Sequence, residues 1–583
     1  MSPKKNPTVP AESPAPKGPV QPKRKTEPAP KADPPAPTPA PEKPKAPSKP
    51  KAPAKTPVVK PPAKPKAPQK PRVPRTRKAA APAATAVTPE TPAAVPKNEG
   101  LRIVMVGSEA HPFAKTGGLA EVLGALPAAL ARLGHDVTVI IPRYRGIDMS
   151  SSVSTPHEFS LAGRPLQIAF VEKTLDAGVK AVLVDAPELF DREGLYGASG
   201  RDFPDNGWRF AVLSRAALEY ARMKKMRPSV FHAHDWQAGL VPVYQKMHFS
   251  SDPHVGGVPC VFTIHNLAFQ GVFGSSALQA FGLGPELLDV NALEYWGHIS
   301  FLKGGINFSE KITTVSPTYA KEILTSQYGF GMEGVLRRRS DELIGILNGI
   351  DTERWNPQAD AFAPHFSLDD LAAKRRAKQH LLQTLKLPFH DGAMSRPVVG
   401  VISRLTDQKG FDLVGAAAED LMELDVTWAM LGSGDSHYEQ LWKTLAARHP
   451  AKVSATIGFD ERLAHLIEAG SDLFLMPSRF EPCGLNQMYS LRYGTVPVVR
   501  ATGGLQDTVR DVTEPGANGF KFSDYTPGAM VAALRRALQA YGDAGQWSAL
   551  QRTGMQRDSS WDVSAREYVK VYRSSLSEDV NGI

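Results

Sequence analysis

From Leu101 onward, short runs rich in Val, Ile and Leu alternate with stretches of helical spacing, and this alternation limits the possible folds most. The strand-like runs are 101–107, 137–141, 181–185, 229–232, 261–265, 311–316, 398–403, 428–432, 454–459, 473–477 and 496–500. The helical stretches between them include 119–133, 210–223, 411–424, 463–469 and 487–493. Strands that alternate with helices predict parallel sheets covered on both faces, and more than ten strands are too many for one open sheet. We therefore predict an α/β protein with two doubly wound, Rossmann-like domains.

The segment 348–357, NGIDTERWNP, is the best dividing point, because turn residues cluster there after a strand-like run at 343–347. We expect a first domain over 101–350 and a second over 351–560. The remaining segment, 561–583, places Trp561, Ala565, Tyr568, Tyr572 and Leu576 on one helical face. This helix should therefore pack against another part of the protein.

Residues 1–100 differ from the rest of the chain in composition. They hold 29 of the 52 prolines, no Phe, Trp, Tyr, Leu or Ile, and a net charge of +15, so that the remaining residues carry −5. A segment of this kind cannot bury enough apolar surface to fold, and we predict a disordered, Pro/Lys/Ala-rich basic tail that acts as a tether. Weak, salt-sensitive contact with anionic polymers is its possible function. A basic-tailed nucleic-acid-binding protein is an alternative, but the rest of the chain is acidic and has no recognition motif.

The chain has no run of 18 apolar residues, and its first residues, MSPKKNPTVP, lack the apolar core of a secretory signal. Its only cysteines, Cys260 and Cys483, argue against a disulfide framework and for a reducing compartment. We therefore expect a cytoplasmic protein with no membrane partner. The sequence leaves the oligomeric state open.

Loops at the ends of the predicted strands carry groups that bind anions, which matters because ligands of open α/β sheets bind at the carboxyl ends of strands. In the loop 115–121, KTGGLAE, two glycines let backbone amides approach a ligand at a helix N-terminus, and Lys115 adds a positive charge. The loop 403–410, SRLTDQKG, offers Arg404 and Lys409. An Arg and a Lys at this spacing suit a diphosphate and the charge that grows on it as it leaves.

Two later loops have the same character. In the loop 477–487, PSRFEPCGLNQ, Glu481 precedes Gly484 at the start of a helix. A carboxylate at this place can accept hydrogen bonds from sugar hydroxyls. The loop 501–505, ATGGL, repeats the pair of glycines at a helix start. Each loop alone is equally well a tight turn or a charged surface, but four of them at successive strand ends indicate a site for a phosphorylated ligand.

The histidines suggest a competing interpretation. His232 and His234 have the His-x-His spacing of some metal hydrolases, and Asp235 follows them directly. The longer metal-binding pattern is broken, however, and the neighbouring loops suit phosphates. His265, at another strand end, is better interpreted as a hydrogen-bonding group in the cleft or as a core histidine.

With these segments in view, the chain closely resembles the starch and glycogen synthase family of retaining glucosyltransferases, from Leu101 to about Leu576. The resemblance rests on the segments 115–119, 232–236, 265–271, 315–319, 328–334, 403–406, 408–410, 478–484 and 502–505, all in the family's order. It implies a glycosyltransferase-B fold, in which two Rossmann-like domains face each other across a cleft and the C-terminal helix returns to the first domain. It also implies transfer of glucose from ADP-glucose to the nonreducing-end 4-hydroxyl of an α-1,4-glucan such as glycogen, with retention of configuration and without a metal or cofactor.

The resemblance further assigns roles to individual residues. Arg404 and Lys409 would bind the donor diphosphate, Glu481 would hold sugar hydroxyls, and Asp235 and His265 would line the glucosyl site. The other positions expected to contact ADP-glucose are Lys115, Gly117, Gly118, Glu121, Asn348, Phe459, Gly484, Leu485, Asn486, Thr502 and Gly503.

The chain departs from the family's pattern at a few positions. Glu121 replaces a usual Asp, Asn486 a usual Thr, and Phe459 a common Tyr, so that UDP-glucose as donor, or another acceptor, remains an alternative. Tyr489 stands where other retaining transferases of this fold have a second carboxylate.

Overall fold

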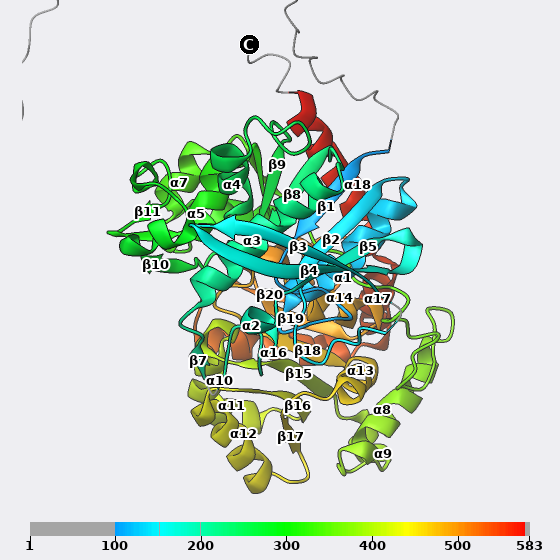
Figure 1. The fold of residues 1–583 in the computed structure, drawn as a ribbon. Coiled ribbons are helices and arrows are strands. Elements are labelled where there is room, and N and C mark those ends of the chain that lie inside the picture. Colours follow the sequence, from blue (N-terminus) through cyan, green and yellow to red (C-terminus); the bar gives the residue numbers. More distant parts are fainter. Residues whose placement is uncertain (1–99, 151, 199, 578–583) are drawn as a thin grey trace, which may run out of the picture. The chain divides into compact units, whose positions relative to one another are not determined.

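The computed structural model describes residues 100–150, 152–198 and 200–577. The predicted tail lies outside these residues except for Gly100. Within them, the chain forms two large sheets with helices on their faces, one built from each half of the folded sequence (Figure 1). The prediction of an α/β protein with two Rossmann-like domains is confirmed.

The first domain is built on a sheet of nine strands among the described residues, in the order β14-β13-β9-β8-β1-β2-β5-β4-β3. Its strands are β1 (Arg102–Val106), β2 (Asp136–Pro142), β3 (Val153–Leu161), β4 (Arg164–Thr174), β5 (Lys180–Asp185), β8 (Val230–His234), β9 (Cys260–Ile264), β13 (Lys311–Thr314) and β14 (Leu343–Gly345). Its helices are α1 (Gly118–Arg132), α2 (Pro187–Phe190), α3 (Asn206–Met223), α4 (Val241–His248), α5 (Phe301–Phe308), α6 (Pro317–Glu322) and α7 (Glu333–Arg338). Two small sheets accompany it, one of β6 (Gly197–Ala198) and β7 (Arg201–Asp202) and one of β10 (Val272–Gly274), β11 (Glu294–Tyr295) and β12 (His298–Ser300).

The second domain is built on a parallel sheet of six strands in the described part of the chain, in the order β17-β16-β15-β18-β19-β20. Its strands are β15 (Val398–Leu405), β16 (Thr427–Gly434), β17 (Val453–Ile457), β18 (Leu473–Met476), β19 (Val496–Arg500) and β20 (Phe520–Phe522). Its helices are α8 (Lys374–Thr384), α9 (Asp391–Ser395), α10 (Phe411–Ala416), α11 (Ala418–Glu423), α12 (Ser436–Arg448), α13 (Glu461–Gly470), α14 (Asn486–Arg492), α15 (Gly503–Thr508), α16 (Pro527–Tyr541) and α17 (Ala544–Gln556).

The prediction of purely parallel sheets is wrong at one edge of the first domain. There β3 and β4 form a long antiparallel hairpin, and β4 pairs antiparallel with β5. Exposed and covered residues alternate along β3, as expected for a strand with one face in solvent, and its Pro156 is tolerated because β3 is the edge strand. The helix expected over 411–424 is also divided, because the backbone of Ala417 leaves the helical conformation between α10 and α11.

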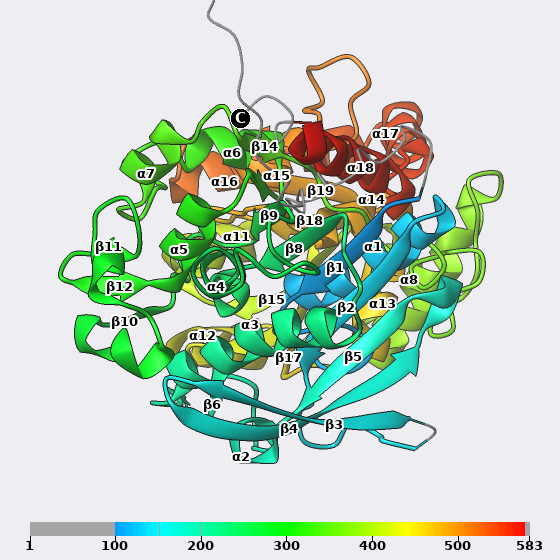
Figure 2. The same ribbon diagram turned by 45° about the horizontal axis from the view of Figure 1, so that its top comes forward.

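The last helix, α18 (Trp561–Ser577), packs on the first domain rather than the second. Figure 2 shows α18 beside α1, and Trp561, Tyr568 and Tyr572 are buried in a core shared with α1 and β1. The Tyr572 hydroxyl also lies 2.8 Å from Nδ1 of His232 on β8. The chain therefore crosses between the domains twice. Among the described residues, no helix is both long and apolar enough to span a membrane.

Candidate active site

A cavity of about 790 Å³ lies between the two domains. The carboxyl-terminal end of β16 and loops that follow the strands β1, β8, β9 and β13 of the first sheet and β15, β17 and β18 of the second contribute to its wall. The cavity therefore lies where the carboxyl ends of both sets of parallel strands meet, which is where open α/β sheets bind ligands. Its volume falls within the range of small-molecule sites.

Most of the residues predicted for the site line this cavity. They are Gly117, Gly118, Asp235, His265, Asn348, Arg404, Lys409, Phe459, Glu481, Gly484, Leu485 and Asn486. Lys115, Glu121, Thr502 and Gly503 do not line it.

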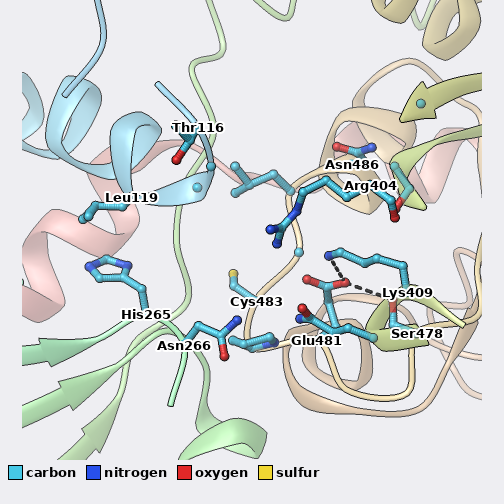
Figure 3. A pocket seen from close by; sticks show the side chains of 18 of the residues that line it. Thr116, Leu119, His265, Asn266, Arg404, Lys409, Ser478, Glu481, Cys483 and Asn486 are labelled. Atoms are coloured by element: carbon cyan, nitrogen blue, oxygen red, sulfur yellow. Dashed lines mark hydrogen bonds and ion pairs between the residues drawn. The ribbon is translucent and has the colours of Figure 1, made fainter. Parts of the chain in front are cut away.

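The second domain contributes two cations and a carboxylate to the cavity. Nζ of Lys409 lies 2.6 Å from Oε2 of Glu481, and the Ser478 hydroxyl donates to the same oxygen at 2.9 Å. Among the described residues, the Arg404 guanidinium has no hydrogen-bond or ion-pair partner and is exposed to the cavity. Figure 3 shows the ends of Arg404 and Lys409 directed toward the middle of the cavity, across from His265 and Thr116. One cation is thus held by a buried carboxylate, while the other is free to bind an anion.

Backbone contacts fix the loop that carries Glu481. The amide of Arg479 donates to the carbonyl of Gln408 at 2.9 Å, and Gly504 donates to the Glu481 carbonyl at 3.1 Å. Gly410 has a φ of +79°, and a Cβ there would lie 2.0 Å from the Pro477 carbonyl oxygen, so only glycine fits beside Lys409. The Lys409 and Glu481 loops therefore hold each other in place.

The first domain contributes Asp235 and His265. Asp235 has a φ of +55°, an uncommon conformation for a residue other than glycine, and it accepts a hydrogen bond from the His265 amide at 2.7 Å. Burial raises the pKa of Asp235 to about 7. Burial also lowers the pKa of His265 to about 3, so its ring is neutral near pH 7. His265 therefore offers hydrogen bonds without a charge near pH 7, and the raised pKa of Asp235 makes its carboxyl easier to protonate than an exposed one.

The surroundings of the histidines do not favour the metal interpretation. The ring nitrogens of His232 lie 2.8 Å from the Tyr572 hydroxyl and 2.6 Å from the Thr263 hydroxyl. Nδ1 of His234 lies 3.0 Å from Nε2 of His265. In the described part of the chain, no group of three or more His, Cys, Asp or Glu side chains is placed to hold a metal ion.

Sequence analysis missed Glu109, a buried carboxylate that lines the cavity. It accepts hydrogen bonds from the backbone and hydroxyl of Thr116 and from the Tyr196 hydroxyl. Glu109 thereby holds the glycine loop at 116–118. Its position three residues after β1 was an available signal, whereas Tyr196 carries none because it reaches the site from a distant segment.

Lys115 pairs with Glu121 instead of facing the cavity. Glu121 also lies 3.7 Å from Arg354, whose Nε donates to Glu461 at 3.1 Å. A chain of ion pairs thus connects the first glycine loop, α1, the segment between the domains and α13. In this arrangement Lys115 does not line the cavity, so its predicted contact with the donor is not formed here.

Thr502 and Gly503 bind a carboxylate of the protein itself. The Thr502 hydroxyl and the Gly503 amide donate to Oε1 of Glu322, at 2.9 and 3.1 Å. In return, the amide and hydroxyl of Thr318 donate to Asp507 at 2.9 and 2.6 Å. The helices α6 and α15, one from each domain, therefore cap each other. Glu322 thus occupies the helix start where we predicted contact with ADP-glucose, and Thr502 and Gly503 do not line the cavity.

Comparisons with known proteins agree with this geometry. A family model described as the starch synthase catalytic domain matches residues 102–338, and one described as glycosyl transferases group 1 matches residues 387–550. A glycogen synthase of Anaeromyxobacter dehalogenans is 48% identical over 477 residues, which cover 81% of this chain and 99% of that protein. A glycogen synthase of Koribacter versatilis is 44% identical over 485 residues, 82% of this chain and 98% of that protein.

A solved structure is also similar along the same part of the chain. The catalytic domain of starch synthase IV from Arabidopsis thaliana, bound to ADP and acarbose, is 34% identical with a TM-score of 0.76. The similarity covers 82% of this chain and 100% of that one. The chain therefore belongs to the starch and glycogen synthase family and is a glucosyltransferase with the glycosyltransferase-B fold.

Proposed function

We propose that this enzyme transfers glucose from ADP-glucose to the nonreducing-end 4-hydroxyl of an α-1,4-glucan such as glycogen, with retention of configuration. The observation that carries the proposal is the free guanidinium of Arg404 beside Lys409 in a cavity between two Rossmann-like domains. The solved relative bound to ADP supports an adenine nucleotide as the carrier.

The donor diphosphate would bind at Arg404 and Lys409. An Arg fork offers two parallel hydrogen bonds to phosphate oxygens, and the Lys adds a compact charge. Gly117 and Gly118, which line the cavity from the first domain, leave room for phosphate oxygens at the start of α1. Phe459, 78% exposed at the cavity, offers an aromatic face to the adenine.

Asn348 also has a polar group available to the donor. It is buried in the segment between the domains and lines the cavity, and its Oδ1 has no hydrogen-bond partner among the described residues. A buried acceptor without a partner is unfavourable unless a ligand donates to it. A hydroxyl of the nucleotide or the sugar would meet this need.

In the reaction, the bond between glucosyl C1 and the phosphate oxygen breaks, and its electron pair goes to the departing ADP. The acceptor 4-oxygen bonds to C1 on the same face, and its proton passes to the departing phosphate oxygen. Arg404 and Lys409 stabilise the negative charge that develops on ADP. No metal or cofactor is needed for this step, because the two side chains supply the positive charge.

Glu481 would bind sugar hydroxyls close to the positive charge that develops on the ring. Its carboxylate is already held by Lys409 and Ser478, which suits a hydrogen-bond acceptor better than a nucleophile. Tyr489 has no carboxylate to offer, and its ring stacks on Trp355 with centroids 3.9 Å apart. Asp235 and His265 would contact the glucosyl group from the first domain.

Two finer expectations belong to the same proposal. We place the enzyme in the cytoplasm, because its two cysteines, Cys260 and Cys483, are free and buried, as in proteins of reducing compartments. We expect the basic tail to contribute only salt-sensitive contacts with anionic polymers.

Comparing donors tests the proposal. Purified enzyme is given ADP-glucose or UDP-glucose with glycogen as primer, and the incorporation of glucose is measured as kcat/KM for each donor. We expect ADP-glucose to be used with the higher kcat/KM. A higher value for UDP-glucose would contradict the assignment of the donor, and no incorporation from either donor would contradict the proposal as a whole.

A further inference from the structure

Trp296 and Phe330 are exposed aromatic residues with an unusual backbone. Their φ angles are +52° and +48°, and the residues are 78% and 37% exposed. Bulky residues rarely adopt this left-handed conformation, and backbone strain of this kind concentrates at functional sites. The fold therefore accepts strain at two positions where it presents an aromatic ring to solvent.

The two residues lie side by side. The Tyr295 hydroxyl donates to the Phe330 carbonyl at 2.7 Å, and the Gln270 side chain donates to the same oxygen at 2.9 Å. A Cβ on Gly331 would lie 2.7 Å from the Tyr295 hydroxyl and 3.5 Å from Nε1 of Trp296. The segment of Phe330 therefore rests against the turn between β11 and β12 that carries Trp296.

This surface continues into the active-site cavity. Phe269, which directly precedes Gln270, is 53% exposed and lines the cavity. The ring of Phe330 meets that of Phe480 edge to face, with centroids 5.4 Å apart, and Phe480 directly precedes Glu481. We call Phe269, Trp296 and Phe330 the aromatic shelf. It extends from the cavity over the first domain, where β10, β11 and β12 form a small sheet (Figure 1).

We propose that the aromatic shelf binds the acceptor glucan several sugar units away from its reacting end. The inference rests on the proposed function, because it takes an α-1,4-glucan as the acceptor. A polymer whose end reaches Glu481 is longer than the cavity and must leave it, and the shelf begins where Phe269 lines the wall. Pyranose rings present faces of C–H groups, which pack well on exposed aromatic rings, and they carry no charge that the shelf would need to match.

Variants of Trp296 test the shelf by chain length. For Trp296→Ala we expect KM for glycogen and for maltoheptaose to rise about tenfold, the scale of one lost aromatic stack. KM for maltotriose, KM for ADP-glucose and kcat should stay within about twofold, because a short acceptor ends before it reaches Trp296. Trp296→Phe should recover most of the affinity. Phe389→Ala is the matched control, because Phe389 is an exposed aromatic residue of the second domain, 47% exposed, outside the shelf.

Several outcomes would overturn the proposal. They are an equal change in KM for long and short acceptors, a loss of kcat on maltotriose together with a lower Tm, or the same effect from Phe389→Ala. The first two would indicate a structural role for Trp296. A dimer that dissociates on Trp296→Ala in sedimentation would show that a second copy covers the shelf, which also contradicts the proposal.

Retardation of the protein in a native gel that contains glycogen separates this inference from the proposed function, because the gel contains no donor. If the wild type does not use ADP-glucose, the proposed function fails, while the gel still tests the shelf. Retardation that weakens in Trp296→Ala and returns in Trp296→Phe supports glucan binding. Equal retardation of all three proteins contradicts it.

Discussion

Arg404→Ala separates catalysis from folding more cleanly than any other change in this cavity. The guanidinium of Arg404 is exposed and has no hydrogen-bond or ion-pair partner among the described residues, so its removal breaks no hydrogen bond or ion pair there. The free energy of unfolding should therefore change by no more than about 0.5 kcal/mol. The loss of one preorganised group that stabilises the leaving phosphate should raise the activation barrier by roughly 3 kcal/mol, which lowers kcat about a hundredfold.

Lys409→Ala would not separate the two effects. Nζ of Lys409 lies 2.6 Å from Glu481, and the side chains are 19% and 6% exposed. Removing the lysine leaves a buried carboxylate without its cation, and breaking a buried pair in this way costs about 3 to 5 kcal/mol of stability. We therefore expect Lys409→Ala to lose kcat and Tm together, whereas Arg404→Ala loses kcat alone.

The assay is the rate of ADP release at saturating ADP-glucose and glycogen, combined with thermal unfolding of the same samples. Arg535→Ala, a change of an exposed arginine on α16, is the control and should alter neither quantity. A kcat of Arg404→Ala within threefold of the wild type would remove Arg404 from the mechanism. A clear drop in Tm for Arg404→Ala would refute the argument that its side chain has no role in folding.

Three further predictions concern charge, metal and the tail. Burial raises the folded-state pKa of Asp235 from the ordinary 3.8 to about 7, so the folded protein binds the extra proton, and this contribution to stability is lost as pH rises from about 4 to 7. Asp235→Asn should therefore gain stability relative to the wild type at pH 8 but not at pH 4 in urea unfolding, and parallel pH profiles would contradict this. Turnover should be unchanged in excess EDTA, and a loss that zinc restores would revive the metal interpretation of His232 and His234. Deletion of residues 1–97 should leave kcat and glucan KM unchanged and abolish any salt-sensitive binding to anionic polymers, whereas an intact fold with a tenfold lower kcat would show that the tail reaches the active site.

The elements that could be predicted from the sequence are those whose conformation depends on residues close together in the chain. The strands β1 and β15 appear as short aliphatic runs, and the loops after them carry glycines next to cations. Such runs form buried parallel strands in almost any α/β protein, so both sheets followed from pattern alone. The β3–β4 hairpin did not, because its polar residues and its prolines, Pro156 and Pro165, interrupt the continuous aliphatic runs by which we located the other strands.

The parts of the site that could not be predicted depend on contacts between distant segments. The Gly-Gly start of α15 was predicted to bind the donor, and only tertiary packing shows that the carboxyl group of Glu322, 180 residues earlier, accepts its hydrogen bonds instead. Lys115 is a different case, because its partner Glu121 is only six residues away, but the loop motif does not show which group the flexible lysine side chain contacts. Glu109 and Tyr196 form one hydrogen-bonded group although 87 residues separate them.

The most direct test of the central claim is the structure of the product. Purified enzyme is incubated with ADP-glucose labelled with carbon-13 at C1 and with maltoheptaose, and NMR of the new glycosidic bond reports its configuration and linkage. We predict an α-configured bond to the 4-oxygen of the nonreducing end. A β-configured product, or a bond to another hydroxyl, would contradict the account of Arg404, Lys409 and Glu481 as the groups that carry a retaining transfer to an α-1,4-glucan.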